Sequence, residues 1–197
     1  MRLSLYQQHV RDWKDCTRCE LHETRQKVVL CRGSVPCDVL FVGEAPGESE
    51  NVIGQPFVGP AGKLLDEIVK RAWQGITNIS WAMTNLVACI PRDMDEGGKT
   101  AEPDVDSVQA CAPRLQEFVI ISKPRLIVCV GSVSRDWLDS KYKGNIRLED
   151  DRGLIQQVDI AHPAYILRLN VAQRGLAMQR CVVTIRNAIE DYCLQED

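Results

Sequence analysis

Short apolar segments rich in β-branched residues alternate along this chain with longer segments of helical periodicity. The apolar segments are predicted to be strands, at 38–42, 79–87, 126–130 and 154–160. Apolar residues at helical spacing predict helices, at 61–73, 105–121, 133–139 and about 173–194. Such alternation is typical of a parallel sheet covered by helices on both faces. We therefore predict an α/β fold, a three-layer α/β/α sandwich around a central four-stranded parallel sheet.

The chain has 197 residues and no internal repeat or low-complexity linker, so we expect a single domain over 1–197. No apolar run approaches the roughly 18 residues that span a bilayer, which predicts no membrane association. The first 13 residues are amphipathic and charged, unlike a signal peptide, so we expect a cytoplasmic protein. In that compartment nine cysteines favour metal binding or free thiols over disulfides.

The net charge of −3 gives no overall attraction to nucleic acid. Between positions 160 and 189, however, the chain has no Asp or Glu and four arginines, namely Arg168, Arg174, Arg180 and Arg186. These arginines could form a phosphate-contacting surface or simply a solvated helix face. On charge alone, the solvated face is the favoured interpretation.

A loop rich in glycine and proline, formed by residues 43–47 and 54–62, lies between the first predicted strand and the first predicted helix. Glycines there let the backbone approach a ligand closely and direct amide N–H groups at it. Phe57 adds a flat apolar face. The loop is therefore predicted to bind a planar, polar ligand.

Polar residues follow three of the predicted strands: Glu44, Asn85 and His162. Each has an ordinary structural explanation when taken alone, such as capping, turn formation or core packing. In an open α/β sheet, however, ligands bind at the carboxyl ends of the strands. We therefore expect the three side chains to converge on one site.

Cys16 and Cys19 form a C-x-x-C pair, which can grip one metal centre and needs two further ligands for a tetrahedral thiolate set. Three cysteines are expected to be core thiols: Cys129 in a predicted strand, and Cys181 and Cys193 in the last predicted helix. The remaining candidates form two pairs, Cys31 with Cys37 and Cys89 with Cys111. Local spacing does not decide between these pairs.

Several motifs together resemble the family-4 uracil-DNA glycosylases, which carry an iron–sulfur cluster. They are Gly43-Glu44-Ala45-Pro46-Gly47, the loop from Gly54 to Leu65, Thr84-Asn85 with Cys89, and His162-Pro163. The resemblance extends from Cys16 to about Arg168. It implies a 4Fe–4S cluster held by Cys16, Cys19, Cys89 and Cys111, with the N-terminal C-x-x-C segment closing the site. Cys31 and Cys37 would then be ordinary thiols.

The resemblance also implies an activity: a monomeric, monofunctional glycosylase that hydrolyses the N-glycosidic bond of uracil in single- or double-stranded DNA. The residues expected to bind the flipped base are Glu44, Ala45, Pro46, Phe57, Asn85 and His162. Phe57 would stack on the base, the Asn85 amide would read its Watson–Crick edge, and a neutral His162 would stabilise negative charge on O2. The candidate carboxylates for orienting water are Glu44 and Glu50. The segment expected to contact DNA contains Pro163, Ala164, Tyr165 and Arg168.

Two departures from the family pattern motivate alternatives. The family usually has Asp where this chain has Asn51, which predicts slower water activation or greater reliance on Glu50. Gly47 stands roughly where another branch of the superfamily has a tyrosine that blocks C5 of the base. One alternative is therefore a glycosylase for another modified pyrimidine, and another is a non-enzymatic nucleic-acid-binding relative.

Overall fold

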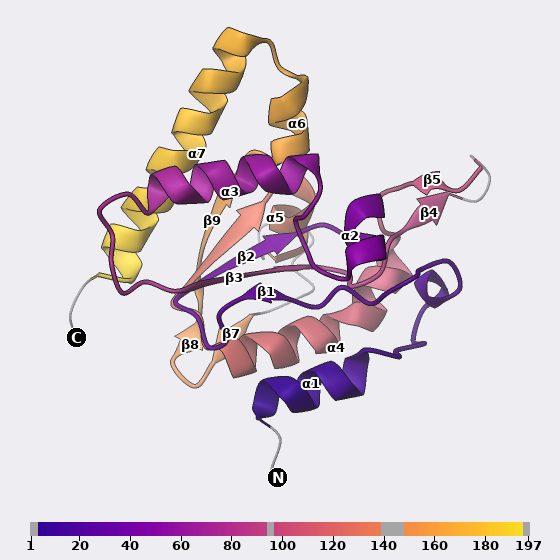
Figure 1. Ribbon diagram of the computed structural model, residues 1–197. Coiled ribbons are helices and arrows are strands. Elements are labelled where there is room, and N and C mark those ends of the chain that lie inside the picture. The colour runs from indigo at the N-terminus through magenta and orange to yellow at the C-terminus, as the bar shows by residue number, and fades with distance from the viewer. Residues whose placement is uncertain (1–3, 94–96, 139–147, 195–197) are drawn as a thin grey trace.

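The computed structural model describes residues 4–93, 97–138 and 148–194, and its centre is a sheet of order β1-β3-β2-β6-β9 (Figure 1). Four of its strands run parallel and confirm the predicted sheet: β2 (Val39–Gly43), β3 (Trp81–Asn85), β6 (Leu126–Val130) and β9 (Gln156–Ile160). A fifth strand, β1 (Arg32–Gly33), pairs antiparallel with β3. It has only two residues, too few to give a periodic signal in the sequence.

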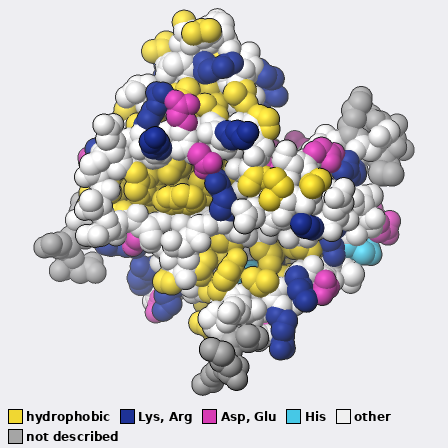
Figure 2. Space-filling model, viewed as in Figure 1, with side chains coloured by type: hydrophobic (Ala, Val, Ile, Leu, Met, Phe, Trp, Pro, Cys, Tyr) yellow, Lys and Arg dark blue, Asp and Glu magenta, His cyan; other side chains and the backbone are white. Residues whose placement is uncertain are grey.

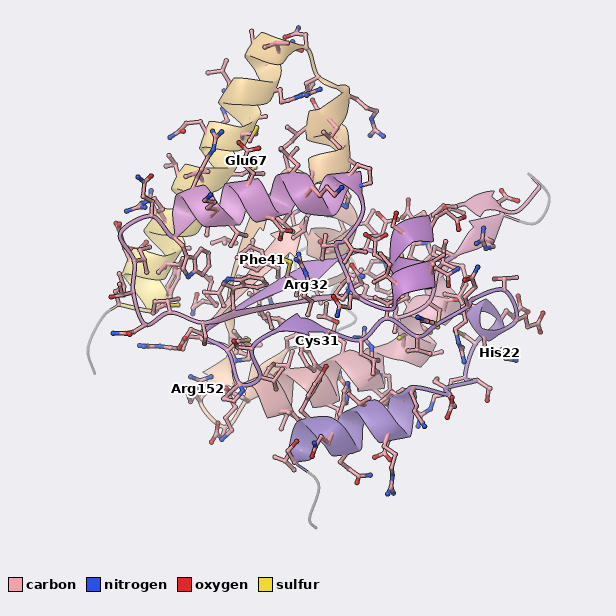
Figure 3. All side chains as sticks on the ribbon, viewed as in Figure 1. His22, Cys31, Arg32, Phe41, Glu67 and Arg152 are labelled. Atoms are coloured by element: carbon pink, nitrogen blue, oxygen red, sulfur yellow. The ribbon has the colours of Figure 1, made fainter. Side chains whose placement is uncertain are left out.

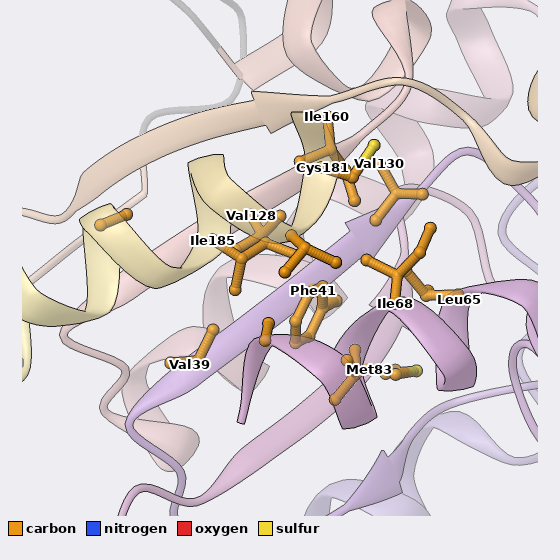
Figure 4. Close-up of a cluster of buried hydrophobic side chains, with 14 of the residues drawn as sticks. Val39, Phe41, Leu65, Ile68, Met83, Val128, Val130, Ile160, Cys181 and Ile185 are labelled. Carbon is orange, nitrogen blue, oxygen red and sulfur yellow. The ribbon is translucent and has the colours of Figure 1, made fainter. Parts of the chain in front are cut away.

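The central strand β2 explains why its sequence is a continuous apolar run. Val39 and Phe41 belong to the core on one face of the sheet, whereas Leu40 and Val42 belong to the core on the other. All five residues of β2 are buried, as expected of a parallel strand covered on both sides. Figure 4 shows the first of these cores, in which Phe41 packs among Leu65, Ile68 and Met83.

Helices cover both faces of the sheet. The face that carries Phe41 is covered by α3 (Pro60–Ala72), α6 (Pro163–Arg168) and α7 (Val171–Tyr192). The other face is covered by α4 (Val105–Ser122) and α5 (Ser132–Leu138), and α1 (Leu5–Trp13) packs on α4. The structure therefore has the three layers that the sequence predicts. None of the helices in the described ranges combines the length and apolar character that a membrane crossing requires.

Several elements differ from the sequence prediction. The predicted strand 154–160 begins at Gln156, because Gly153–Leu154 forms β8 of a small hairpin with β7 (Glu149–Asp150). The expected loop 91–103 contains a hairpin of β4 (Arg92–Asp93) and β5 (Lys99–Thr100). The last residue of the predicted helix 133–139 lies outside the described residues.

Short helical segments were missed altogether. Both α2 (Glu48–Ile53) and α6 have six residues, fewer than two turns, so neither develops a clear apolar stripe. A single 3₁₀ turn, η1 (Glu20–His22), follows the C-x-x-C pair. Each of these helices begins directly after a residue of the predicted site: α2 after Gly47 of the glycine-rich loop, and α6 after His162.

Candidate active site

The ends of β2 and β3 lie side by side, which brings the glycine-rich loop next to Asn85. The strand register pairs Gly43 with Asn85. The pairing continues beyond the strands, because the Leu86 N–H donates to the Gly43 carbonyl at 2.9 Å and the Val87 N–H donates to the Glu44 carbonyl at 3.3 Å. Glu44 and Asn85 therefore occupy the same edge of the sheet, as the strand-end argument predicts.

Gly43 is the point where the Asn85 amide and the Phe57 ring come together. A Cβ atom at position 43 would lie 2.5 Å from Cζ of Phe57 and closer still to Oδ1 of Asn85. Phe57 itself has a left-handed backbone (φ 56°) and is buried, with only 7% of the residue exposed. Gly62 allows this, because a side chain there would collide with the Phe57 carbonyl. Gly43, Gly62 and the left-handed backbone of Phe57 therefore together hold the Phe57 ring beside the Asn85 amide.

His162 lies across the sheet from Asn85. Since β3 and β9 are three strand spacings apart in the sheet order, the two strand ends are separated by about 14 Å. Gly131, at the end of β6, backs the histidine: its φ is +97°, and a Cβ there would lie 2.9 Å from Cβ of His162. The two strands between them, β2 and β6, end at or just before a glycine, Gly43 and Gly131, so no side chain projects from either of these positions.

The protonation state of His162 follows from its position as the N-cap of α6. Its Nδ1 accepts a hydrogen bond from the Ala164 N–H at 3.1 Å, which requires the ring proton to be on Nε2. Burial lowers the pKa of His162, and the positive charge of Arg168 lowers it further. The imidazole is therefore neutral at pH 7 and carries an N–H donor on Nε2.

Glu44 and Asn85 have hydrogen-bonding capacity that the protein does not use. Neither side chain makes a hydrogen bond or ion pair within the described part of the chain, although Asn85 is only 2% exposed. Burial raises the pKa of Glu44, and the negative charge of Glu102 raises it further. Buried polar groups are normally paired, so unpaired ones at the strand ends indicate a place for a ligand.

Glu50, in contrast, is engaged in holding the loop, and Asn51 is engaged through its Oδ1 while its Nδ2 is buried without a hydrogen-bond partner among the described residues. The Glu50 carboxylate accepts hydrogen bonds from the N–H groups of Gly47 at 3.1 Å and of Val58 and Gly59 at 2.8 Å. Asn51 is buried, and its Oδ1 accepts from the Gln26 N–H at 2.8 Å. Both residues therefore have a structural task, and the catalytic role expected of Glu50 and the effect of Asn51 on water activation stay predictions.

The segment expected to contact DNA forms α6. Pro163 is buried and Ala164 half-buried, whereas Tyr165 is 51% exposed and Arg168 points into solvent. Figure 2 shows basic side chains over the region of α3, α6 and α7. Two of the four arginines noted in the sequence have structural partners: Arg174 donates to the Leu167 carbonyl, and Arg186 donates to those of Ala72 and Gln74.

The remaining two arginines of this run, Arg168 and Arg180, are exposed and make no hydrogen bond or ion pair with another described residue. The favoured interpretation from charge alone, a solvated helix face, does not describe Arg174 and Arg186, which are half-buried and donate to backbone carbonyls. Only Arg168 and Arg180 keep a guanidinium available for a phosphate.

Four cysteines line one pocket between the N-terminal segment and α4. They are the C-x-x-C pair, a residue just beyond β3 and a residue on α4, namely Cys16, Cys19, Cys89 and Cys111. All nine cysteines are free thiols, and no group of three or more potential ligands within the described ranges is close enough to hold a metal ion as it stands. Cys31 and Cys37 lie elsewhere, in the core beside β1, and Figure 3 shows Cys31 well separated from His22 of η1.

The surroundings of the cysteine pocket suit a negatively charged centre. Three arginines line it, namely Arg18, Arg25 and Arg114. Arg25 lies 3.5 Å from the sulfur of Cys89. Without ligands, burial raises the pKa of Cys89 to about 11, an effect that the charge of Arg25 opposes. Guanidinium groups stabilise thiolates, so the donor set and its charge environment fit a thiolate-bound metal centre.

The comparison with known proteins agrees with this arrangement. The sequence profile of the Uracil DNA glycosylase superfamily matches residues 14–185. The chain belongs to the uracil DNA glycosylase superfamily. It is 34% identical over 166 residues to the type-4 uracil-DNA glycosylase of Pyrobaculum aerophilum, a match that covers 79% of this chain and 81% of that protein. It is 33% identical over 160 residues to the type-4 uracil-DNA glycosylase of Thermotoga maritima, which covers 79% of both proteins.

A solved structure has a similar fold. The crystal structure of wild-type Pedobacter heparinus SMUG2 aligns with a TM-score of 0.54 over 79% of this chain and 76% of that protein. The two sequences are only 13% identical, so this likeness concerns the fold alone. The expected uracil-DNA glycosylase-like architecture is confirmed.

Some residues that shape this superfamily member's site escaped the sequence analysis. Gly131 ends a predicted strand, but nothing in the sequence shows that it backs His162. Arg114 reads as an ordinary polar position of a helix, yet it is the largest fully buried side chain of the described residues. This buried arginine gives no sequence signal, because two of its three partners are backbone carbonyls, which any sequence provides.

Proposed function

We propose that this protein excises uracil from DNA by hydrolysing the N-glycosidic bond, as a monofunctional glycosylase of base-excision repair. The observation that carries the proposal is the placement of Glu44, Asn85 and His162 at one sheet edge. The side chains of Glu44 and Asn85 have no hydrogen-bond partner among the described residues, and His162 uses only its Nδ1 there. The kinship with type-4 uracil-DNA glycosylases supports it. We take DNA as the substrate, a monomer as the active form and the cytoplasm, in contact with the nucleoid, as the place of action.

Recognition of the base begins with flipping it out of the duplex, which costs a few kcal/mol. Phe57 provides the face on which the ring stacks, and the loop backbone at Ala45 and Pro46 borders the same space. The Asn85 amide donates to O4 of uracil and accepts from its N3–H. Cytosine has an amino group and an unprotonated N3 at these positions, so an amide held in one orientation discriminates against it.

Cleavage leaves negative charge on the base and positive charge on the sugar. His162, neutral and with its proton on Nε2, donates to O2 and stabilises the departing anion. Loss of one such donor typically costs about 2.7–4 kcal/mol in the barrier. The Ala45 N–H is available for the same purpose, whereas Pro46 has no N–H to donate.

We assign Glu44 as the catalytic carboxylate. It is the acidic residue of the loop whose oxygens are left unpaired, and its ionised form would orient water and stabilise the cationic sugar. Glu50 acts indirectly, by holding the loop through three backbone N–H groups. The segments 43–47, 84–90 and 160–165 contain no lysine, so no amine nucleophile is available there and hydrolysis is the expected outcome.

We further propose that Cys16, Cys19, Cys89 and Cys111 hold a 4Fe–4S cluster. Such a cluster would supply a structural crosslink through four thiolates. In this chain the crosslink would join the segment after α1 to the end of β3 and to α4. The DNA-contacting surface of the proposal consists of Pro163, Ala164, Tyr165 and Arg168.

A base-release assay tests the proposal. Purified protein is incubated with single- and double-stranded oligonucleotides containing one uracil, and alkali-labile sites are measured. We expect release by the wild type and a loss of at least 100-fold in H162A and N85A, with N187A, an exposed asparagine of α7, as the matched control. DNA binding without release would favour the non-enzymatic alternative. Faster release from 5-substituted uracils than from uracil would favour the alternative that Gly47 motivates.

A further inference from the structure

Arg114 is buried directly behind the end of β3. It comes from α4 and is 1% exposed. Its guanidinium donates to Oγ1 of Thr84 at 2.9 Å, to the carbonyl of Leu86 at 2.8 Å and to the carbonyl of Asn85. One side chain therefore binds three consecutive residues, and the middle one is the proposed base-reading asparagine.

The same arginine belongs to the cysteine pocket. It lines that pocket and follows Cys111 by three positions, which is about one helical turn. Its hydrogen-bond partners in the described part of the chain are all neutral oxygens. A buried charge without a counter-charge is unfavourable, and ionised thiolates in the pocket would compensate it. The strand end holds the arginine in the structure, and thiolates in the pocket would add a counter-charge.

The orientation of the Asn85 amide depends on its backbone. The side chain makes no hydrogen bond within the described part of the chain, and its Oδ1 packs directly on Gly43. A rotated or shifted peptide at position 85 would move the amide off Gly43. Arg114 binds Oγ1 of Thr84 before Asn85, the carbonyl of Asn85 itself and the carbonyl of Leu86 after it. It therefore restrains the backbone on both sides of Asn85.

We propose that Arg114 is a positioning residue for uracil recognition: it holds the end of β3 so that the Asn85 amide meets the edge of the flipped base. This inference rests on the proposed function and extends it to a residue that does not contact the substrate. A planar guanidinium with several donors is required, because a lysine ammonium could not bind three separated oxygens in this geometry.

A double-mutant cycle tests this role. Single-turnover rates of uracil release are measured for wild type, R114Q, N85A and R114Q/N85A, together with the affinity for DNA containing an abasic-site analogue. We expect R114Q to lower the rate at least 10-fold in the wild-type background, to lower it less than 3-fold in the N85A background, and to leave DNA affinity within 3-fold. Such non-additivity is the signature of a residue that acts through Asn85.

Two further variants complete the experiment. R186Q is the matched control, because Arg186 also donates to two backbone carbonyls, at the end of α3, and should leave the rate unchanged. R114K keeps the charge and serves if R114Q does not fold; it should show the same loss. Equal rate losses for the arginine variant in both backgrounds, or a wild-type rate in folded R114K, would overturn the inference. A wild type that releases no uracil would instead refute the proposed function.

Discussion

Substitution of Gly43 by alanine should disable the site while leaving the fold largely intact. The added methyl group would lie 2.5 Å from Cζ of Phe57 and nearer still to Oδ1 of Asn85. Ordinary contacts between carbon atoms are about 3.5–4.0 Å, so the ring or the amide must move by about 1 Å or more. Both groups are proposed to contact the base, so one methyl group disturbs stacking and edge recognition together.

The size of the effect follows from this displacement. A misplacement of about 1 Å can cost roughly 100-fold in rate, which corresponds to about 2.7 kcal/mol in the barrier. Single-turnover uracil release, with enzyme in excess over a uracil-containing oligonucleotide, isolates the chemical step from product release. Thermal unfolding of the same preparation shows how much of the loss comes from folding.

G175A is the matched control for this prediction. Gly175 lies in α7, and a Cβ there would meet nothing within 4 Å. The same chemical change should therefore leave the rate unchanged and raise the free energy of unfolding by about 0.5–1 kcal/mol. If G43A retained a rate within about threefold of the wild type, the packing of Asn85 and Phe57 on Gly43 would not matter for function.

Three further predictions concern charges and thiols. E102Q should shift the acidic limb of the pH–rate profile to lower pH. The charge of Glu102 raises the pKa of Glu44, and the ionised form of Glu44 is lost as pH falls through that raised value. An unshifted limb would show that Glu102 does not act on the site. E50A should lower the free energy of unfolding by about 2–3 kcal/mol in denaturant titrations, since three N–H groups lose a charged acceptor. E44Q should lower the rate of uracil release without that loss of stability. C89S should abolish absorbance near ~400 nm and C181S should retain it; a colourless wild type, or colour in C89S, would contradict the proposed cluster.

The sheet and the meeting of Glu44 and Asn85 at one of its edges could be predicted because they depend on local pattern and topology. The residues of β2 and β6 are apolar at every position, which identifies buried parallel strands without any tertiary information. Once four parallel strands are assumed, Glu44 and Asn85 must lie at the same edge. Their proximity in the structure follows from strand pairing alone.

The tasks of Glu50, Asn51 and Arg114 could not be predicted in the same way. Except for the Thr84 hydroxyl that Arg114 binds, their partners are backbone N–H and carbonyl groups, which no residue type marks in the sequence. In the sequence, Glu44 and Glu50 are two glutamates of the same loop, six positions apart, and look equally suited to catalysis. Only the folded loop shows that the oxygens of one are occupied and those of the other are not.

The hydrogen bonds of Glu50 to the loop also determine whether the loop loses conformational entropy during folding or during ligand binding. Fixing the backbone of a flexible residue costs roughly 1–2 kcal/mol, and the loop between Gly47 and Gly59 would incur that cost on binding if it were mobile. Because one carboxylate ties both ends of this loop, the ordering takes place during folding. A flipped base then meets a pocket that already has its final shape, so the binding free energy is available to offset unstacking of the DNA.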